Sequence, residues 1–199
     1  MKVLFVDACP RREESRTLAL AQHFVSQLRA LQPELSLTVH CLPEMGLTGI
    51  DRDTLQRKEA LCDARCWSDP LVRAGRDLSE ADAAVIAAPY WDLMFPSILK
   101  VWIEHIWVRN LTFVYRNDKP VGLLRAKYAI FLTTAGSRLQ GHDWGTLYLE
   151  DVLKTLGVPR FYRIAAEGLD LEGADPGALL GKAMAEAEAL ASALCIEGS

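Results

Sequence analysis

Two hydroxyl residues flank an arginine in Ser15-Arg16-Thr17, where an apolar run has just ended and a helical pattern begins. Hydroxyls and free backbone N–H groups at a helix start form a seat for phosphate, because the helix dipole favours negative charge there. Arg11 and Arg12 add positive charge nearby. The glycine-based phosphate loops, G-x-G-x-x-G and G-x-x-x-x-G-K-[ST], do not occur. The simpler interpretation is that Ser15 only caps the helix and the arginines are solvated.

Two further loops follow apolar runs. Residues 89–96 hold Tyr90, Trp91 and Phe95 and end at Pro96, which opens a long apolar segment. Such rings suit the wall of a site for a flat ligand, although a hydrophobic elbow between a strand and a helix explains them equally well. The third loop, Thr134 to Ser137, has small side chains that permit close backbone approach to a ligand.

The elements that position these loops alternate between strand and helix. Apolar periodicity predicts strands over 2–6, 35–41, 83–88, 127–133 and 161–166, the second with an exposed face at a sheet edge. Helices are expected over 15–33, 96–107, 143–157 and 176–195, with two more inside 51–78, while 111–115 is extended and 117–120 is a turn. This alternation predicts an α/β, doubly wound parallel sheet in one domain, 1–199. The length also permits two small domains.

Right-handed crossovers place the ends of the first, third and fourth strands on one rim of such a sheet. The loops 7–15, 89–96 and 134–141 then form one site. A phosphate seat, an aromatic wall and a loop rich in backbone amides suit a mononucleotide with a large planar ring, and flavin mononucleotide (FMN) fits that description better than a plain nucleotide.

Composition narrows the possible partners and the compartment. The 199 residues carry a net charge of −4 with no basic stripe, which argues against nucleic acid. No apolar run is long enough for a signal peptide or a membrane span. The five cysteines have no disulfide-framework spacing, and we expect reduced thiols in the cytoplasm. The four histidines show no zinc-ligand spacing, so no metal is expected.

Long motifs resemble those of the flavodoxin-like NAD(P)H dehydrogenase (quinone) and FMN-dependent azoreductase family. Residues 88–100 resemble A-P-M-Y-N-F-x-I-P-S-x-L-K, and 112–115 resemble T-F-x-Y. Residues 121–127 resemble G-L-L-x-G-K, 133–137 resemble T-S-x-G-G, and 147–158 resemble P-Y-L-x-x-x-L-x-F-I-G-I. Near the start, Cys9-Pro10-Arg11 and Ser15-Arg16-Thr17 resemble S-P-R and S-x-S. The likeness spans nearly the whole chain, in the right order.

The resemblance implies a flavodoxin-like fold with five parallel strands in the order 2-1-3-4-5 and helices on both faces. It implies FMN reduced by NADH or NADPH, and electron transfer to a quinone, azo or nitro aromatic acceptor. It implies a homodimer with sites at the interface, which would explain an apolar helix after Pro96. The family chemistry needs no dedicated acid–base residue. The implied cofactor-binding residues are Cys9, Ser15, Arg16, Thr17, Pro89, Tyr90, Trp91, Asp92, Leu93, Thr134, Ala135, Gly136 and Ser137, and the implied substrate-binding residues are Phe113 and Tyr115.

Some positions depart from the family pattern. Cys9 replaces a serine, Tyr90-Trp91-Asp92 replaces M-Y-N, and Ser137 replaces the second glycine. A carboxylate at Asp92 beside the ring would disfavour anionic reduced flavin. Cys9 is either an inert thiol or an oxidant-sensing thiolate.

Several alternatives remain open at this point. His105 and His142 are packing or surface residues, or they touch the substrate or the nicotinamide. The charged stretch 51–77 is a solvated helical face, or it covers the pocket of a partner subunit. The alternative function is a non-enzymatic electron carrier or flavin-binding redox sensor.

Overall fold

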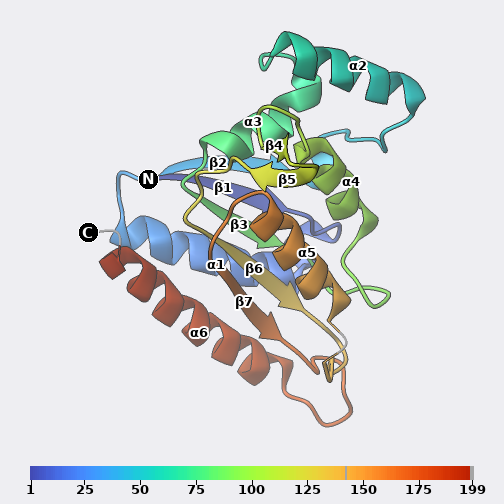
Figure 1. The fold of residues 1–199 in the computed structure, drawn as a ribbon. Coiled ribbons are helices and arrows are strands. Elements are labelled where there is room, and N and C mark those ends of the chain that lie inside the picture. Colours follow the sequence, from blue (N-terminus) through green and yellow to red (C-terminus); the bar gives the residue numbers. More distant parts are fainter. Residues whose placement is uncertain (142, 198–199) are drawn as a thin grey trace.

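The computed structural model describes residues 1–141 and 143–197, and five parallel strands form its central sheet (Figure 1). In chain order they are β1 (Lys2–Asp7), β2 (Ser36–Cys41), β3 (Ala83–Ala87), β6 (Tyr128–Thr134) and β7 (Phe161–Ala166). Their spatial order is β2-β1-β3-β6-β7, which is the predicted order 2-1-3-4-5 once the sheet strands are counted alone. The predicted sheet is therefore confirmed, with β2 at an edge.

The described residues form six α-helices. They are α1 (Arg16–Leu31), α2 (Arg52–Ala64), α3 (Arg73–Glu80), α4 (Ser97–Ile106), α5 (Trp144–Thr155) and α6 (Pro176–Glu197). Short 3-10 turns lie at η1 (Arg12–Glu14), η2 (Leu42–Glu44) and η3 (Pro70–Val72). None of the described helices combines the length and apolar character needed to cross a bilayer.

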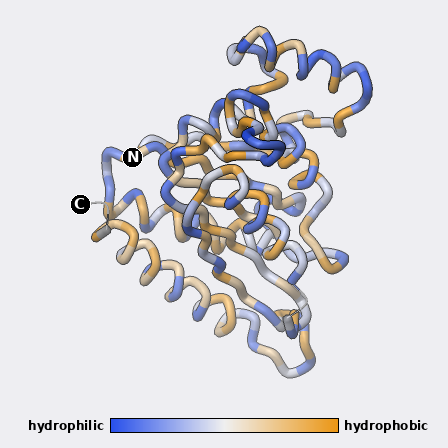
Figure 2. The backbone as a smooth tube through the Cα atoms, in the orientation of Figure 1, coloured by the Kyte–Doolittle hydropathy of each residue, from blue (hydrophilic) through white to orange (hydrophobic). Residues whose placement is uncertain are grey.

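Side chains of alternate residues in each central strand pack into two hydrophobic cores, one on either face of the sheet. Val3 and Phe5 of β1 pack toward α1 and α6, whereas Leu4 and Val6 pack toward α3, α4 and α5. Because both faces of β1, β3 and β6 are covered, these three strands are continuous apolar runs instead of an alternating pattern. Figure 2 shows that the sheet is hydrophobic, whereas α2, which projects from the body, is more hydrophilic.

Helix α4 is buried mostly by its own chain. Its residues Leu99, Trp102, Ile103 and Ile106 are at most 1 % exposed. Packing within the chain therefore explains why this helix is apolar on nearly every side, since α4 lies beside α3 in the core on one face of the sheet.

The segment after α4 folds differently from its prediction. Strands β4 (Phe113–Arg116) and β5 (Lys119–Gly122) pair as an antiparallel hairpin, so the predicted turn over 117–120 is too long. Only Asn117 and Asp118 form the turn, both with positive φ (50° and 60°), which suits a two-residue hairpin loop. Pro120 is tolerated because a two-stranded ribbon consists of edge strands.

A buried polar network holds β2 to two helices. The Trp102 indole N–H donates to His40 Nδ1 at 3.1 Å, so the proton of the neutral imidazole lies on Nε2, 3.0 Å from Asp77 Oδ2. Burial lowers the pKa of His40, which favours this neutral form. His40 is thus a satisfied core histidine.

Candidate functional site

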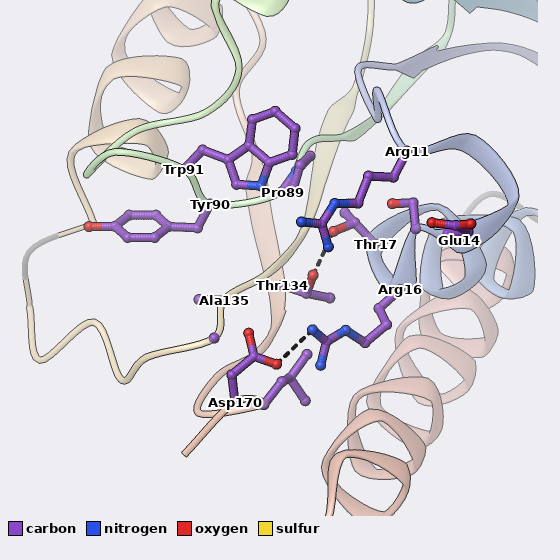
Figure 3. Close-up of a pocket in the computed structure, with 13 residues that line it drawn as sticks. Arg11, Glu14, Arg16, Thr17, Pro89, Tyr90, Trp91, Thr134, Ala135 and Asp170 are labelled. Carbon is purple, nitrogen blue, oxygen red and sulfur yellow. Dashed lines mark hydrogen bonds and ion pairs between the residues drawn. The ribbon is translucent and has the colours of Figure 1, made fainter. Parts of the chain in front are cut away.

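The loops at the carboxyl ends of β1, β3 and β6 line one pocket, as predicted from the topology (Figure 3). We call its lining the cradle. Its members are Arg11, Glu14, Ser15, Arg16, Thr17, Pro89, Tyr90, Trp91, Thr134, Ala135, Gly136, Leu169 and Asp170. Nine of the thirteen predicted cofactor-binding residues are among them: Ser15, Arg16, Thr17, Pro89, Tyr90, Trp91, Thr134, Ala135 and Gly136.

The first wall of the cradle is the N-terminus of α1. Ser15 is the N-cap, and its Oγ accepts a hydrogen bond from Leu18 N at 3.2 Å. The first backbone N–H groups of a helix have no intrahelical acceptor, so those of the first turn are available to an anion. A capping hydroxyl still has its own proton to donate. The two interpretations of Ser15, helix cap and phosphate seat, are therefore compatible.

A hydroxyl pair joins this wall to the third loop. Thr17 Oγ1 and Thr134 Oγ1 lie 2.6 Å apart, and the two residues are 1 % and 8 % exposed. Two hydroxyls share one hydrogen bond, which leaves one proton to be donated to another acceptor. The pair thus offers a donor at the pocket.

A buried carboxylate, that of Asp7, holds the loop that follows β1. Asp7, at the end of β1, accepts from Cys9 N at 3.0 Å and also pairs with the Arg12 guanidinium. The Asp7 carboxylate raises the pKa of Arg12, which adopts a left-handed conformation (φ 51°). Sequence reasoning missed this pair. The available signal was a carboxylate at the end of a buried strand, followed by arginines.

Cys9 lies behind the cradle and does not line it. Its Sγ is 3.7 Å from Ala87 O, and the residue is fully buried. Burial, the largest cause, raises the pKa of the Cys9 thiol. This environment favours the inert thiol over the thiolate sensor, and the predicted cofactor contact of Cys9 remains a prediction.

The second wall of the cradle is formed by Pro89, Tyr90 and Trp91 in the loop that follows β3. Tyr90 N donates to Thr134 O at 2.9 Å, which holds Tyr90 beside β6. Trp91 and Met94 then exchange two backbone hydrogen bonds of 2.8 Å, closing a tight turn.

Asp92 and Leu93 occupy the tip of that turn and are not part of the cradle lining. Both have positive φ (50° and 65°) and both are exposed. Aspartate and asparagine tolerate this conformation better than leucine does, so the turn itself explains a short polar residue at position 92. Asp92 lines a neighbouring, mainly apolar hollow of about 570 Å³ with Phe95, Ile98 and Tyr148. Ring contacts for Asp92 and Leu93 therefore remain predictions.

The third wall is tied to the loop after β7. Ala135 N donates to Ala166 O, Leu169 N donates to Ala135 O, and Asp170 N donates to Gly136 O, all at 2.9–3.1 Å. A Cβ atom on Gly136 would lie 2.3 Å from Asp170 Oδ2, so glycine permits this approach. Ser137 is exposed, and its carbonyl accepts from Gly168 N at 3.0 Å.

Leu169 and Asp170 are cradle residues that sequence reasoning missed. The topology could have found them, because β7 is parallel to β6 and ends at the same rim. Arg163 of β7 reinforces this side through Asp143 and Glu167, both at 2.7 Å. Burial raises the pKa of Tyr90, with smaller contributions from these two carboxylates. His142, another candidate, lies outside the described residues.

Phe113 and Tyr115 lie away from the cradle. They line a second hollow of about 440 Å³, the hairpin hollow, together with Ile50, Leu55, Lys58, Glu59, Cys62, Glu104, Trp107 and Arg109. Phe113 stacks edge-to-face on Trp107 and on Tyr115, with ring centroids 5.0 and 5.4 Å apart. Figure 1 shows α2 and the hairpin at the opposite end of the molecule from the tips of β6 and β7.

Helix α2 is anchored beside the hairpin hollow by a buried lysine. Lys58 Nζ donates to Glu104 O at 2.5 Å near the end of α4, and burial lowers the pKa of Lys58 to about 8. His105 is buried, with Nε2 3.0 Å from Thr48 O, which supports its interpretation as a packing residue. The described residues contain no group of three His, Cys, Asp or Glu side chains able to hold a metal ion.

The cradle fits a phosphorylated flavin on its own geometry. A helix start and buried hydroxyls suit the phosphate, Trp91 and Tyr90 offer flat surface, and Gly136 permits close backbone approach.

Comparison with known proteins agrees with this geometry. A family model described as "Flavodoxin-like fold" matches residues 1–191. An FMN-dependent NADH:quinone oxidoreductase of Coprothermobacter proteolyticus is 31% identical over 96% of this chain and 98% of its own length. That of Caldicellulosiruptor saccharolyticus is 30% identical with the same coverage. The chain belongs to this flavodoxin-like family of FMN-dependent oxidoreductases. The resemblance found in the motifs is confirmed.

Solved structures support the fold of this family member. An azoreductase from Bacillus anthracis superposes with a TM-score of 0.86 over 96% of this chain and 98% of its own, at 20% identity. An FMN-dependent NADH-azoreductase of the same species, solved in complex with FMN, gives 0.85 over 98% and 99% at 20% identity.

Proposed function

We propose that the protein is an FMN-dependent oxidoreductase that uses NADH or NADPH to reduce quinone, azo or nitro aromatic acceptors. The observation that carries this proposal is the meeting of the three loops in one cradle, tied by the Thr17–Thr134 hydroxyl pair. When bound, FMN would supply the chemistry, by accepting a hydride and passing on two electrons.

The chain's own residues bind and orient the cofactor in this proposal. Ser15, Thr17 and the first backbone amides of α1 hold the phosphate, with Arg16 adding charge. Pro89, Tyr90 and Trp91 face the ring, and Thr134 to Gly136 close the opposite edge. No side chain has to transfer a proton in this scheme, because redox chemistry resides in the cofactor.

We also propose that two copies of the chain complete each site. The cradle volume is about 140 Å³, whereas small-molecule pockets usually measure about 300–1,000 Å³. Leu93, Tyr115, Trp144 and Leu147 are large side chains with apolar surface, and they are 54–63% exposed. A partner that covers the rim would enlarge the pocket and bury such residues. Phe113 and Tyr115 would then contact the acceptor in the partner's cradle, beside α2.

The direct test is spectroscopic. Purified protein should carry yellow flavin or take up FMN, and anaerobic NADH or NADPH should bleach it before an added quinone restores the colour. Stable bound flavin that neither nicotinamide reduces would instead support the electron carrier. Absence of FMN affinity would reject both functions. The cytoplasmic location remains a prediction.

The oligomeric state has its own test. Leu147→Glu places a charge on the proposed interface, and we expect it to lower the sedimentation mass to that of one chain. Leu31→Glu is the matched control, because Leu31 is 47% exposed at the far end of α1. If wild type and both variants sediment as one chain, the shared site is wrong.

A further inference from the structure

The formal charges of the side chains that line the cradle cancel. Arg11 and Arg16 are positive, and Glu14 and Asp170 are negative. A phosphate monoester carries about −1.5 to −2 at pH 7. A seat for such a group gains affinity from an excess of positive charge, yet here one arginine is already neutralised.

That arginine is Arg16. Its Nη2 lies 2.8 Å from Asp170 Oδ1, and the pair links the first turn of α1 to the loop after β7 (Figure 3). The two side chains are 37% and 63% exposed, so solvent screens the pair and it contributes little to stability. A doubly charged phosphate at the α1 N-terminus would therefore displace the carboxylate from Arg16.

Asp170 is the better fixed of the two partners. Its backbone N donates to Gly136 O at 3.0 Å, and the preceding Leu169 N donates to Ala135 O at 3.1 Å. Its carboxylate packs directly on Gly136, where a Cβ would be only 2.3 Å away. Among the described residues, Asp170 is the only hydrogen-bond or ion-pair partner of the Arg16 side chain, so we expect the guanidinium of Arg16 to reorient toward a bound phosphate.

Building on the proposed FMN function, we propose that Asp170 sets the selectivity of the cradle between FMN and riboflavin. Its carboxylate competes with the phosphate for Arg16 and then remains beside the bound phosphate as an unneutralised negative charge. Both effects lower the affinity that the phosphate contributes. Riboflavin has no phosphate, so its affinity is unaffected. The cradle consequently holds FMN less tightly than its helix start and hydroxyls would allow.

The test replaces only the charge of Asp170. Flavin-free, full-length Asp170→Asn and wild type are titrated with FMN and with riboflavin at low ionic strength, by quenching of flavin fluorescence. Removing one negative charge near a phosphate should lower the Kd for FMN about tenfold. The Kd for riboflavin should change less than about twofold, and added salt should narrow the FMN difference.

A matched control distinguishes the effect of a charge inside the cradle from the effect of the net charge of the chain on FMN affinity. Glu172→Gln removes the same charge from the same loop, at an exposed residue that does not line the cradle. Its Kd for FMN should equal that of wild type. An equal gain in Glu172→Gln would show that net charge alone acts, and would overturn the role of Asp170.

A double-mutant cycle tests the competition for Arg16. Arg16→Gln should weaken FMN binding more in the Asp170→Asn background than in wild type, by about threefold, because Arg16 there has no carboxylate to leave. Weaker FMN binding in Asp170→Asn, or equal tightening for both flavins, overturns the proposal. If FMN binds wild type and Asp170→Asn equally, only the selectivity role fails. If neither flavin binds wild type, the proposed function fails as well.

Discussion

The cradle and the hairpin hollow are built in opposite ways. The cradle lies at the carboxyl ends of the parallel strands β1, β3, β6 and β7, and backbone hydrogen bonds hold its loops. The hairpin hollow lies between a two-stranded ribbon and the projecting α2, with Tyr115 63% exposed. We infer that one chain supplies the residues that bind the cofactor, the cofactor half of the site, whereas a second copy supplies those that bind the acceptor, the acceptor half.

The largest expected effect is a loss of stability when Gly122, where the hairpin packs on the rest of the chain, is substituted. A Cβ on Gly122 would lie 2.0–2.2 Å from backbone atoms of Leu156 and Gly157, which cannot move as a side chain does. Gly122→Ala should therefore lower the free energy of unfolding by about 3 kcal/mol, measured by urea denaturation. Gly49→Ala is the control, since a Cβ there meets nothing within 4 Å. Equal stability of the two variants would mean that the hairpin is only loosely attached.

The second expected effect is a change in FMN affinity that leaves the fold intact. Aspartate and asparagine cap helices as well as serine does, so Ser15→Asp and Ser15→Asn should both fold. The aspartate places negative charge against the phosphate, and we expect its Kd for FMN to rise about a hundredfold, against tenfold or less for Ser15→Asn. Similar Kd values for the two variants would place the phosphate elsewhere.

The third effect concerns the acceptor half. Tyr115→Ala should raise the KM for a quinone about tenfold and leave the Kd for FMN within about twofold, because Tyr115 lies outside the cradle. Tyr115→Phe keeps the ring and should keep the KM near the wild-type value. A loss of FMN affinity in Tyr115→Ala would remove the division between the two halves.

The smallest expected effect is a dependence of stability on pH that arises from Lys58. Burial lowers the pKa of Lys58 from an ordinary 10.5 to about 8, so between these pH values the unfolded chain binds more protons than the folded chain. The burial penalty is present below pH 8 and is relieved as pH rises. Relative to Lys58→Met, wild type should gain about 1 kcal/mol of unfolding free energy between pH 7 and 9. A constant difference across this range would show that Lys58 is not buried as a cation.

The sheet and the rim were predictable because each depends on local pattern plus topology. Continuous apolar runs gave the strands, and parallel order then placed Ser15, Tyr90 and Gly136 on one rim. Asp92 could not be placed from sequence, since its position depends on a tight turn with positive φ. The Arg16–Asp170 pair joins residues 154 positions apart, and no periodicity reports such a contact.

A mixed dimer provides the most direct test of the shared site. One copy carries Ser15→Asp, which weakens FMN binding in its own cradle about a hundredfold, and the other carries Tyr115→Ala, which leaves FMN binding in its own cradle intact. The flavin then sits only in the Tyr115→Ala copy, and the intact Tyr115 belongs to its partner. We predict one FMN per dimer and a wild-type KM for the quinone. A KM raised about tenfold, as in the Tyr115→Ala homodimer, would show that each chain uses its own Tyr115, and would contradict a site shared between two copies.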